Sequence, residues 1–141
     1  MSTDEQDLSL WLSWKRVNEV TRGRILADIL EHTVLTDAEF TVLAHLDDAG
    51  GTLRQNALAT AAGWDRTRLS HLLTRMEQRG YVARERLRNG AEVSALDAGR
   101  AAFAATHEPL VQAVRRHFTS RLTPEQREMI QGISVALGGE A

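Results

Sequence analysis

The sequence predicts a mainly α-helical protein that carries one small β-hairpin, an α+β fold. Apolar residues recur at spacings of three and four along most of the chain, which indicates amphipathic helices. Residues 81–96 instead carry β-type residues on both sides of Asn89-Gly90, a dipeptide that favours a tight hairpin turn. At 141 residues the chain is long enough for a hydrophobic core, and we expect a single domain over residues 1–141.

The first predicted helix covers residues 5–32 and carries an apolar stripe with two tryptophans. Trp14 and Val17 follow Leu10 at intervals of four and three residues, and Trp11 lies beside them. Little chain precedes this helix. The stripe must therefore be covered by a later segment of the chain or by another subunit.

A second helix is expected to begin after Thr36, because Thr36 and Glu39 have the spacing of a capping box. Gly50 and Gly51 would end it. A third, short helix is predicted through residues 53–62. Four of its residues are expected in the core, namely Leu53, Ala57, Leu58 and Ala61.

The fourth predicted helix begins after Asp65, a good N-cap residue, and ends at Gly80. Trp64, which precedes this N-cap, is expected to pack in the core. Apolar residues at positions i, i+3, i+4 and i+7 predict the buried face, namely Leu69, Leu72, Leu73 and Met76. The tight connection between the third and fourth helices gives them the form of a helix-turn-helix.

The hairpin that follows the fourth helix would be a wing. Asn89-Gly90 predicts a two-residue type I′ turn, because both residues tolerate a positive φ. Period-two alternation places Arg84, Arg86 and Arg88 on one face of the first strand. A winged helix-turn-helix core is therefore expected over residues 36–96.

The tail, residues 98–138, is predicted to be helical again. Thr123, Pro124 and Gln126 form a start signal for its last helix. The tail and the helix over residues 5–32 are more apolar than a small winged core requires. Both are therefore expected to be dimerisation helices.

The charge distribution and the absent residue types narrow the function. The formal net charge is −2, yet residues 52–100 hold nine basic and five acidic residues. This excess of positive charge is typical of a surface for a polyanion, and equally of a solvated helix face that carries arginines. The absence of cysteine excludes disulfides, thiolate metal sites and switches based on cysteine oxidation. No apolar run could span a bilayer, and the N-terminus does not resemble a signal peptide, so we expect a cytoplasmic protein without membrane contact.

Together these features resemble the MarR (multiple antibiotic resistance regulator) family of winged helix-turn-helix transcription factors. The resemblance is carried by "LTDAEFTVLAHL", "LRQNALATAAGWDRTRLSHLLTRMEQRGYVARE", "DAGRAAF" and "LTPEQREMI". It implies a transcriptional regulator, expected to be a repressor, that binds a pseudo-palindromic DNA operator as a homodimer and is released by a small ligand. The wing segment "RLRNGAEVSAL" departs from the family pattern, because it is shorter and lacks the usual Asp-x-Arg element.

The expected DNA contacts lie mainly on the fourth helix, where six residues occupy the first turn or the face away from the core, namely Arg66, Thr67, Arg68, Ser70, His71 and Arg75. Ser70, Arg75 and Arg54 are predicted to hold phosphates, and the other four to contact base edges. In the wing, Arg88 is the first candidate contact and Arg86 the second. Three further arginines are interpreted as structural charges, namely Arg79, Arg84 and Arg100.

An aromatic or anionic effector is expected where each dimerisation helix meets the winged core, with Trp14, Arg16 and His32 as candidate contacts. No cofactor is predicted, and no metal, because the histidines form no close ligand pair. The motifs of phosphate loops, nucleophile elbows and metal hydrolases are absent, which argues against an enzyme. Two alternatives stay open: a winged-helix module for protein–protein contact, and a metal-sensing regulator without an organic effector.

Overall fold

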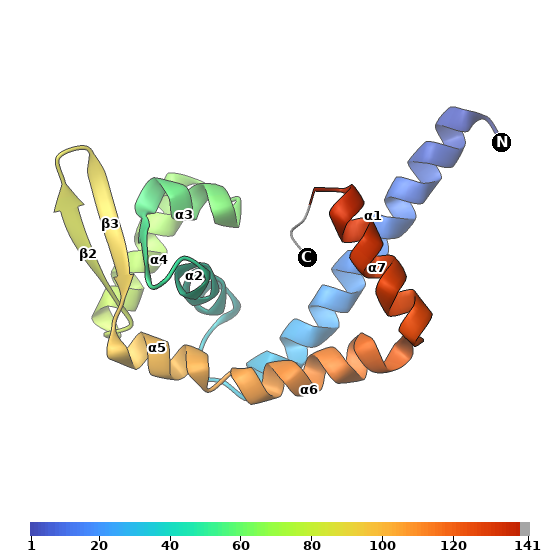
Figure 1. Ribbon diagram of the computed structural model, residues 1–141. Coiled ribbons are helices and arrows are strands. Elements are labelled where there is room, and N and C mark those ends of the chain that lie inside the picture. The colour runs from blue at the N-terminus through green and yellow to red at the C-terminus, as the bar shows by residue number, and fades with distance from the viewer. Residues whose placement is uncertain (139–141) are drawn as a thin grey trace. The chain divides into compact units, whose positions relative to one another are not determined.

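The computed structural model describes residues 1–138 and divides the chain into two compact units. The winged unit covers Leu30–His107, and the helical unit combines Met1–Ile29 with the chain from Glu108 onward. The elements in chain order are α1 (Thr3–Leu30), α2 (Asp37–Asp48), β1 (Thr52–Arg54), α3 (Gln55–Ala62), α4 (Arg66–Gln78), β2 (Val82–Leu87), β3 (Gly90–Ala95), α5 (Asp97–Ala104), α6 (His107–His117), the short 3₁₀ helix η1 (Thr119–Arg121) and α7 (Pro124–Ala136) (Figure 1). The mainly helical fold with a small hairpin is therefore confirmed.

The winged unit is built around the apolar faces of its helices. The predicted capping box starts α2, since Thr36 Oγ1 accepts the amide of Glu39 and Glu39 Oε1 accepts the amide of Thr36. Helix α4 buries the predicted face, namely Leu69, Leu72, Leu73 and Met76. These side chains share one core with residues of α2, α3, β2 and β3.

The sheet has three antiparallel strands in the order β1-β3-β2, of which β1 was not predicted. Leu53 lies in β1 rather than in a helix, and it is half-buried. Helix α3 begins only at Gln55 and buries Leu58 and Ala59. The predicted core positions at the other two alanines were wrong, because both are exposed, namely Ala57 and Ala61.

The hairpin turn differs from the prediction by one residue. Leu87 pairs with Gly90, so the turn residues are Arg88 and Asn89. Among the described residues only glycines have a positive φ, and Gly90 has a φ of +127°. The predicted type I′ turn at Asn89-Gly90 was therefore wrong, because that turn needs a positive φ at Asn89 as well.

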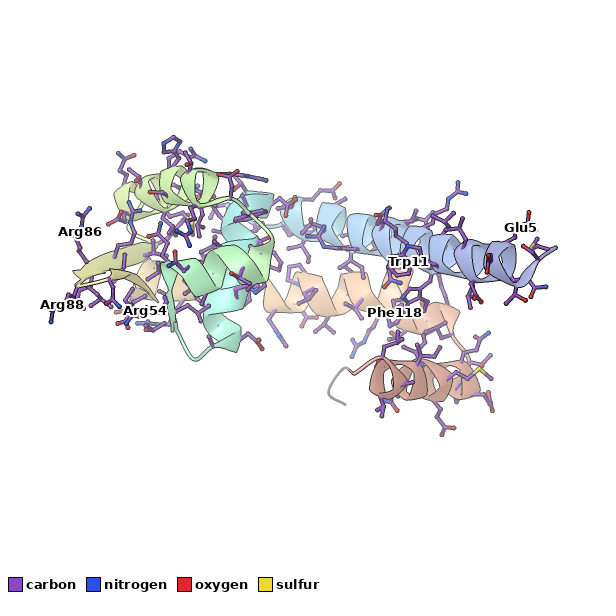
Figure 2. All side chains as sticks on the ribbon, turned by 90° about the horizontal axis from the view of Figure 1, so that it is seen from above. Glu5, Trp11, Arg54, Arg86, Arg88 and Phe118 are labelled. Carbon is purple, nitrogen blue, oxygen red and sulfur yellow. The ribbon has the colours of Figure 1, made fainter. Side chains whose placement is uncertain are left out.

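The helical unit has little buried surface of its own. In the part of it that the structure describes, only Ile29 and Ala113 are buried. Helix α7 starts with the predicted capping box of Thr123 and Gln126. Figure 2 shows the side chains of this unit, with Trp11 on α1 labelled. No helix within residues 1–138 has the length and apolar character that a membrane crossing needs.

Candidate nucleic-acid interface

Helix α4 separates a buried face from an exposed polar face. Its N-cap, Asp65, accepts the amide of Arg68 at 2.8 Å, which holds the first turn in place. Five of the six residues predicted on this helix are exposed, namely Arg66, Thr67, Arg68, His71 and Arg75. The helix carries no acidic residue before Glu77. Its first three turns thus present positive and neutral polar groups to solvent.

Arg68 is partly held in place by an aromatic ring. Its guanidinium carbon lies 4.9 Å from the ring centroid of Trp64, the residue before the N-cap. Trp64 is half-buried and packs against the core, as predicted. A cation over an indole face is an attractive arrangement that limits the motion of the arginine.

Ser70 differs from the other predicted contacts on α4. It is half-buried, and its hydroxyl accepts a hydrogen bond from Arg84 of β2 at 3.2 Å. Arg84 also forms an ion pair with Glu77. The interpretation of Arg84 as a structural charge is therefore confirmed, as it is for Arg100, which pairs with Asp97.

The strand register explains why Arg84 does not join an exposed row of arginines. Arg84 lies opposite Val93, and residues that are directly opposite in a ladder share one face of the sheet. Val93 is fully buried, so this face of the hairpin packs toward the core near its base. Of the three arginines Arg84, Arg86 and Arg88, only the last two, which lie nearer the tip, are exposed.

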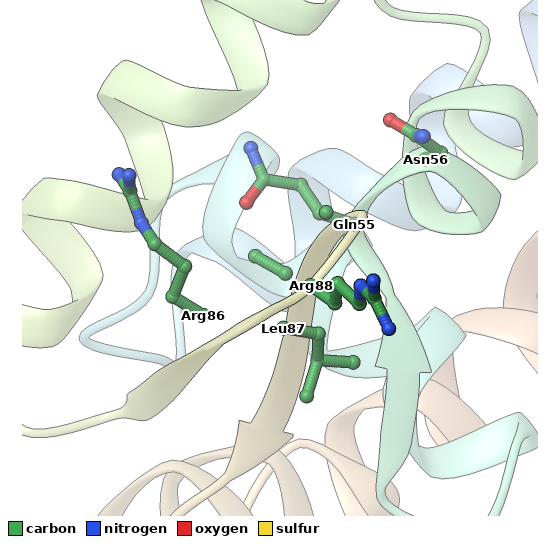
Figure 3. Close-up of a pocket in the computed structure, with 7 residues that line it drawn as sticks. Gln55, Asn56, Arg86, Leu87 and Arg88 are labelled. Carbon is green, nitrogen blue, oxygen red and sulfur yellow. The ribbon is translucent and has the colours of Figure 1, made fainter.

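The tip of the wing and the start of α3 form a groove of about 410 Å³ (Figure 3). Figure 3 shows Arg86 and Arg88 pointing in different directions from the hairpin. The residues that line the groove are Gln55, Asn56, Arg86, Leu87, Arg88, Gly90 and Ala91. The groove therefore combines two guanidinium groups with two side-chain amides.

Arg54 joins this group at the tip of the wing (Figure 2). Its Nη1 donates to the carbonyl oxygen of Asn89 at 3.3 Å, so the side chain ties the end of β1 to the turn. The sequence interpretation missed Gln55 and Asn56, because it did not predict β1. Strand β1 pairs with β3, and this pairing brings the start of α3 beside the wing.

The residues predicted to bind an effector are placed in different units. Trp14 and Arg16 belong to the helical unit, whereas His32 is exposed in the turn after α1, in the winged unit. Arg16 lines a groove of about 340 Å³ on α1, together with Glu5, Leu8, Ser9, Leu12 and Ser13. The pKa of Glu5 is lowered, because the amide and hydroxyl of Ser2 donate to its carboxylate. Across residues 1–138 no group of three or more His, Asp or Glu side chains could hold a metal.

Comparison with known proteins gives a family match within the winged unit and structural matches over nearly the whole chain. The MarR family model matches residues 35–91, which run from the start of α2 to the tip of the wing. AbsC, a MarR family transcriptional regulator from Streptomyces coelicolor, has a TM-score of 0.77 and 29% identity, over 98% of this chain and 92% of that chain. A search of curated proteins found no match.

Two further solved structures have the same fold. Sco3205, a MarR family transcriptional regulator from Streptomyces coelicolor in complex with DNA, has a TM-score of 0.75 and 26% identity, over 97% of this chain and 90% of that chain. The oxidized form of MarR from E. coli has a TM-score of 0.78 and 23% identity, over 91% and 93%. These proteins are regulators rather than enzymes. Residues 35–91 of the winged unit thus match the MarR family model, and the chain is similar in fold to MarR family transcriptional regulators over nearly its whole length.

Proposed function

We propose that the protein binds double-stranded DNA sequence-specifically, as a homodimer, and represses transcription at a pseudo-palindromic operator. The observation that carries this proposal is the division of α4 into a buried apolar face and an exposed basic and polar face. A helix N-terminus usually favours acidic side chains, but the first turn of α4 holds Arg66 and Arg68. That choice suits a phosphate backbone as the ligand. The solved DNA complex of Sco3205, at 26% identity, supports the same conclusion.

The proposed contacts follow the exposure of each side chain. Arg66, Thr67, Arg68 and His71 would meet base edges in the major groove, and Arg75 would hold a phosphate. Arg86 and Arg88 on the wing would extend the contact along the duplex. Ser70 and Arg54 already have hydrogen-bond partners within the chain, so their role at DNA would use the remaining lone pairs or N–H groups.

The homodimer is proposed because the helical unit exposes large apolar side chains. Trp11 is 57% exposed on α1 and Ile133 is 40% exposed on α7. A twofold dimer would cover such surface and would present two α4 helices to two half-sites about one DNA turn apart. Light scattering at micromolar concentration tests this: a stable monomer contradicts the proposal. A protein that acts on DNA in this way is expected in the cytoplasm.

The DNA proposal is tested with DNA fragments of the source genome. The purified protein should retain particular fragments, and its affinity should fall steeply with salt, because bound arginines release counterions from DNA. Arg68→Ala should reduce affinity for a retained site by about 1–3 kcal/mol while affecting random DNA much less. Arg100→Ala, on α5, is the matched control and should change neither affinity. Retention without any sequence preference would contradict sequence-specific binding.

We also propose that a small aromatic or anionic compound releases the protein from its operator. The proposal rests on residue chemistry: Trp14 is 37% exposed and offers a flat apolar face, while Arg16 and His32 offer polar groups. Such a compound would act by binding one arrangement of the dimer more tightly than another. Titration with salicylate, followed by tryptophan fluorescence and operator release, is the test. No change in either signal at millimolar concentration would exclude this class of effector.

A further inference from the structure

We infer that Arg84 is a positioning residue that fixes the orientation of α4 against the wing and thereby determines how well the operator is distinguished from other DNA. The inference rests on the proposed function, since it concerns how the DNA-contacting face is held. Arg84 lies in the middle of β2, two residues before the exposed Arg86. Its own side chain is largely buried, with 20% of its surface exposed.

The guanidinium of Arg84 contacts three residues of α4. Its Nε donates to Glu77 Oε1 at 2.8 Å, and its Nη2 lies 2.6 Å from the same oxygen. Its Nη2 also donates to Thr74 Oγ1 at 2.7 Å. Its Nη1 donates to the hydroxyl of Ser70 at 3.2 Å and to the carbonyl oxygen of Ser70 at 3.4 Å. One side chain of the wing thus holds two turns of the helix.

The three partners of Arg84 form a stripe between the two faces of α4. Ser70, Thr74 and Glu77 follow one another at intervals of four and three residues, so they lie within about 60° on the helix surface. His71, on the exposed face, is about 100° from Ser70. The buried face lies on the other side of the stripe. Arg84 therefore contacts α4 beside the surface that is proposed to meet DNA.

The hydrogen bonds of Arg84 restrain the orientation of α4 more finely than the hydrophobic core does. Apolar packing determines which face of α4 is buried, but it is non-directional, so it does not by itself set the rotation of the helix to within a few degrees. Hydrogen bonds depend strongly on angle. The hydrogen bonds of Arg84 therefore fix the rotation of α4 about its axis relative to β2. An operator needs α4 and the wing in one fixed arrangement. Random DNA, which is held mainly through phosphates, tolerates several arrangements.

The sharpest test is Glu77→Gln, with Glu85→Gln as its matched control. Each change removes one negative charge from the winged unit, and electrostatics alone would raise affinity for any DNA. Glu85 is exposed on β2, and within the described residues no ion pair or hydrogen bond involves its side chain. We expect Glu77→Gln to lower operator affinity on the order of fivefold without lowering random-DNA affinity, because it loosens the contact with Arg84. Glu85→Gln should not lower operator affinity.

Arg84→Lys, with Arg100→Lys as its control, tests the arginine itself. Lysine keeps the charge but cannot reach Ser70, Thr74 and Glu77 together, because it lacks the planar, forked guanidinium. Operator affinity should fall on the order of tenfold, and the salt dependence of binding should stay unchanged, since no phosphate contact is lost. Affinities are compared at a temperature where circular dichroism shows that all variants are folded.

Two results would overturn the inference. If Arg84→Lys and Glu77→Gln lower only the melting temperature and leave the ratio of operator to random-DNA affinity unchanged, Arg84 merely supports the fold. If Arg84→Lys weakens both DNAs equally and lowers the salt slope by about one, Arg84 is a phosphate contact. Wild-type protein without any DNA preference would refute the proposed function itself, and this inference with it.

Discussion

The winged unit and the helical unit use their apolar residues in different ways. In the winged unit, helices α2, α3 and α4 each turn an apolar face into one core, and Leu46, Leu58 and Leu69 are fully buried. In the described part of the helical unit, α7 has no buried residue and α1 has only Ile29. Burial of apolar surface is the main favourable term in folding. The winged unit therefore carries most of the stability that one chain can supply.

The difference indicates what each unit is for. On α1, four exposed apolar residues lie within five positions, namely Leu8, Leu10, Trp11 and Leu12. At about 100° per residue they point to several sides of the helix, whereas a surface helix has a single apolar stripe. A helix that is apolar on several sides is usually buried on several sides. The helical unit thus supports the proposed homodimer, in which a second chain would supply the missing cover.

The largest expected effect comes from a glycine of the winged unit. Gly99 of α5 is packed so closely that an added Cβ would lie 3.0 Å from the carbonyl carbon of Tyr81, and nearer still to its oxygen. Both groups are backbone, so neither can rotate away. Gly99→Ala should lower the free energy of unfolding by about 3 kcal/mol, measured by urea denaturation.

Gly132 of α7 is the matched glycine of the helical unit. Apart from its chain neighbours and the backbone of its own helix, nothing in residues 1–138 lies within 4 Å of an added Cβ. Gly132→Ala should raise stability by about 0.5–1 kcal/mol, because alanine favours a helix. A similar loss for both alanine variants would mean that α7 is as closely packed as the winged unit. Since one chain shows no such packing, that result would locate Gly132 inside the dimer interface.

A smaller effect is expected from the ion pair that joins two helices of the winged unit. Glu39 of α2 is 3% exposed, and both its oxygens lie 2.7 Å from Nη1 of Arg79 at the end of α4. Arg79→Met would leave this buried carboxylate without its cation. We expect a loss of about 2–3 kcal/mol in the free energy of unfolding, below the range for fully buried pairs, because the Arg79 side chain is 41% exposed.

Arg100→Met provides the comparison, because its partner Asp97 is almost fully exposed. Exposed pairs contribute little, so this change should cost less than about 1 kcal/mol. The double variant Glu39→Gln with Arg79→Met should recover part of the stability that Arg79→Met loses, since glutamine is neutral. If it recovers nothing, the loss comes from the contacts of Arg79 with Tyr81 and the Val34 carbonyl instead.

The helices of both units could be predicted because their signals are local. The capping boxes at Thr36 and Thr123 and the buried face of α4 need only residues within a few positions of one another. Strand β1 could not be predicted in this way. It has three residues, too few to show an alternation, and it forms because Thr52 pairs with Ser94 far along the chain.

The candidate site was predictable in its exposed charges but not in its internal contacts. Helical periodicity placed Thr67 and His71 away from the core, and both are exposed. The position of the hairpin turn followed the pairing of Val82 with Ala95, both buried, rather than the local preference of Asn89-Gly90. The contact between Arg84 and Ser70 depends on that register. It could therefore be recognised only once the strands and α4 were placed together.

A further small effect concerns the two capping boxes, which are equal in geometry and differ in what their helices bury. In each box the threonine hydroxyl accepts an amide at 3.2 Å and the threonine amide donates to the side chain at 2.9 Å. Thr36→Ala and Thr123→Ala should therefore each remove about 1 kcal/mol of local helix stability. Helix α2 is anchored in the core, so Thr36→Ala should lower the free energy of unfolding at every protein concentration.

Helix α7 has no buried residue in its own chain, so the loss from Thr123→Ala should instead weaken the proposed dimer. A loss of about 1 kcal/mol per subunit corresponds to a rise of more than tenfold in the dimer dissociation constant, which sedimentation equilibrium can measure. The melting temperature of Thr123→Ala should then depend more on protein concentration than that of Thr36→Ala. Equal losses in the free energy of unfolding for the two variants, in dilute, monomeric protein, would show that α7 is stabilised within one chain. The proposed difference between the two units would then not hold for α7.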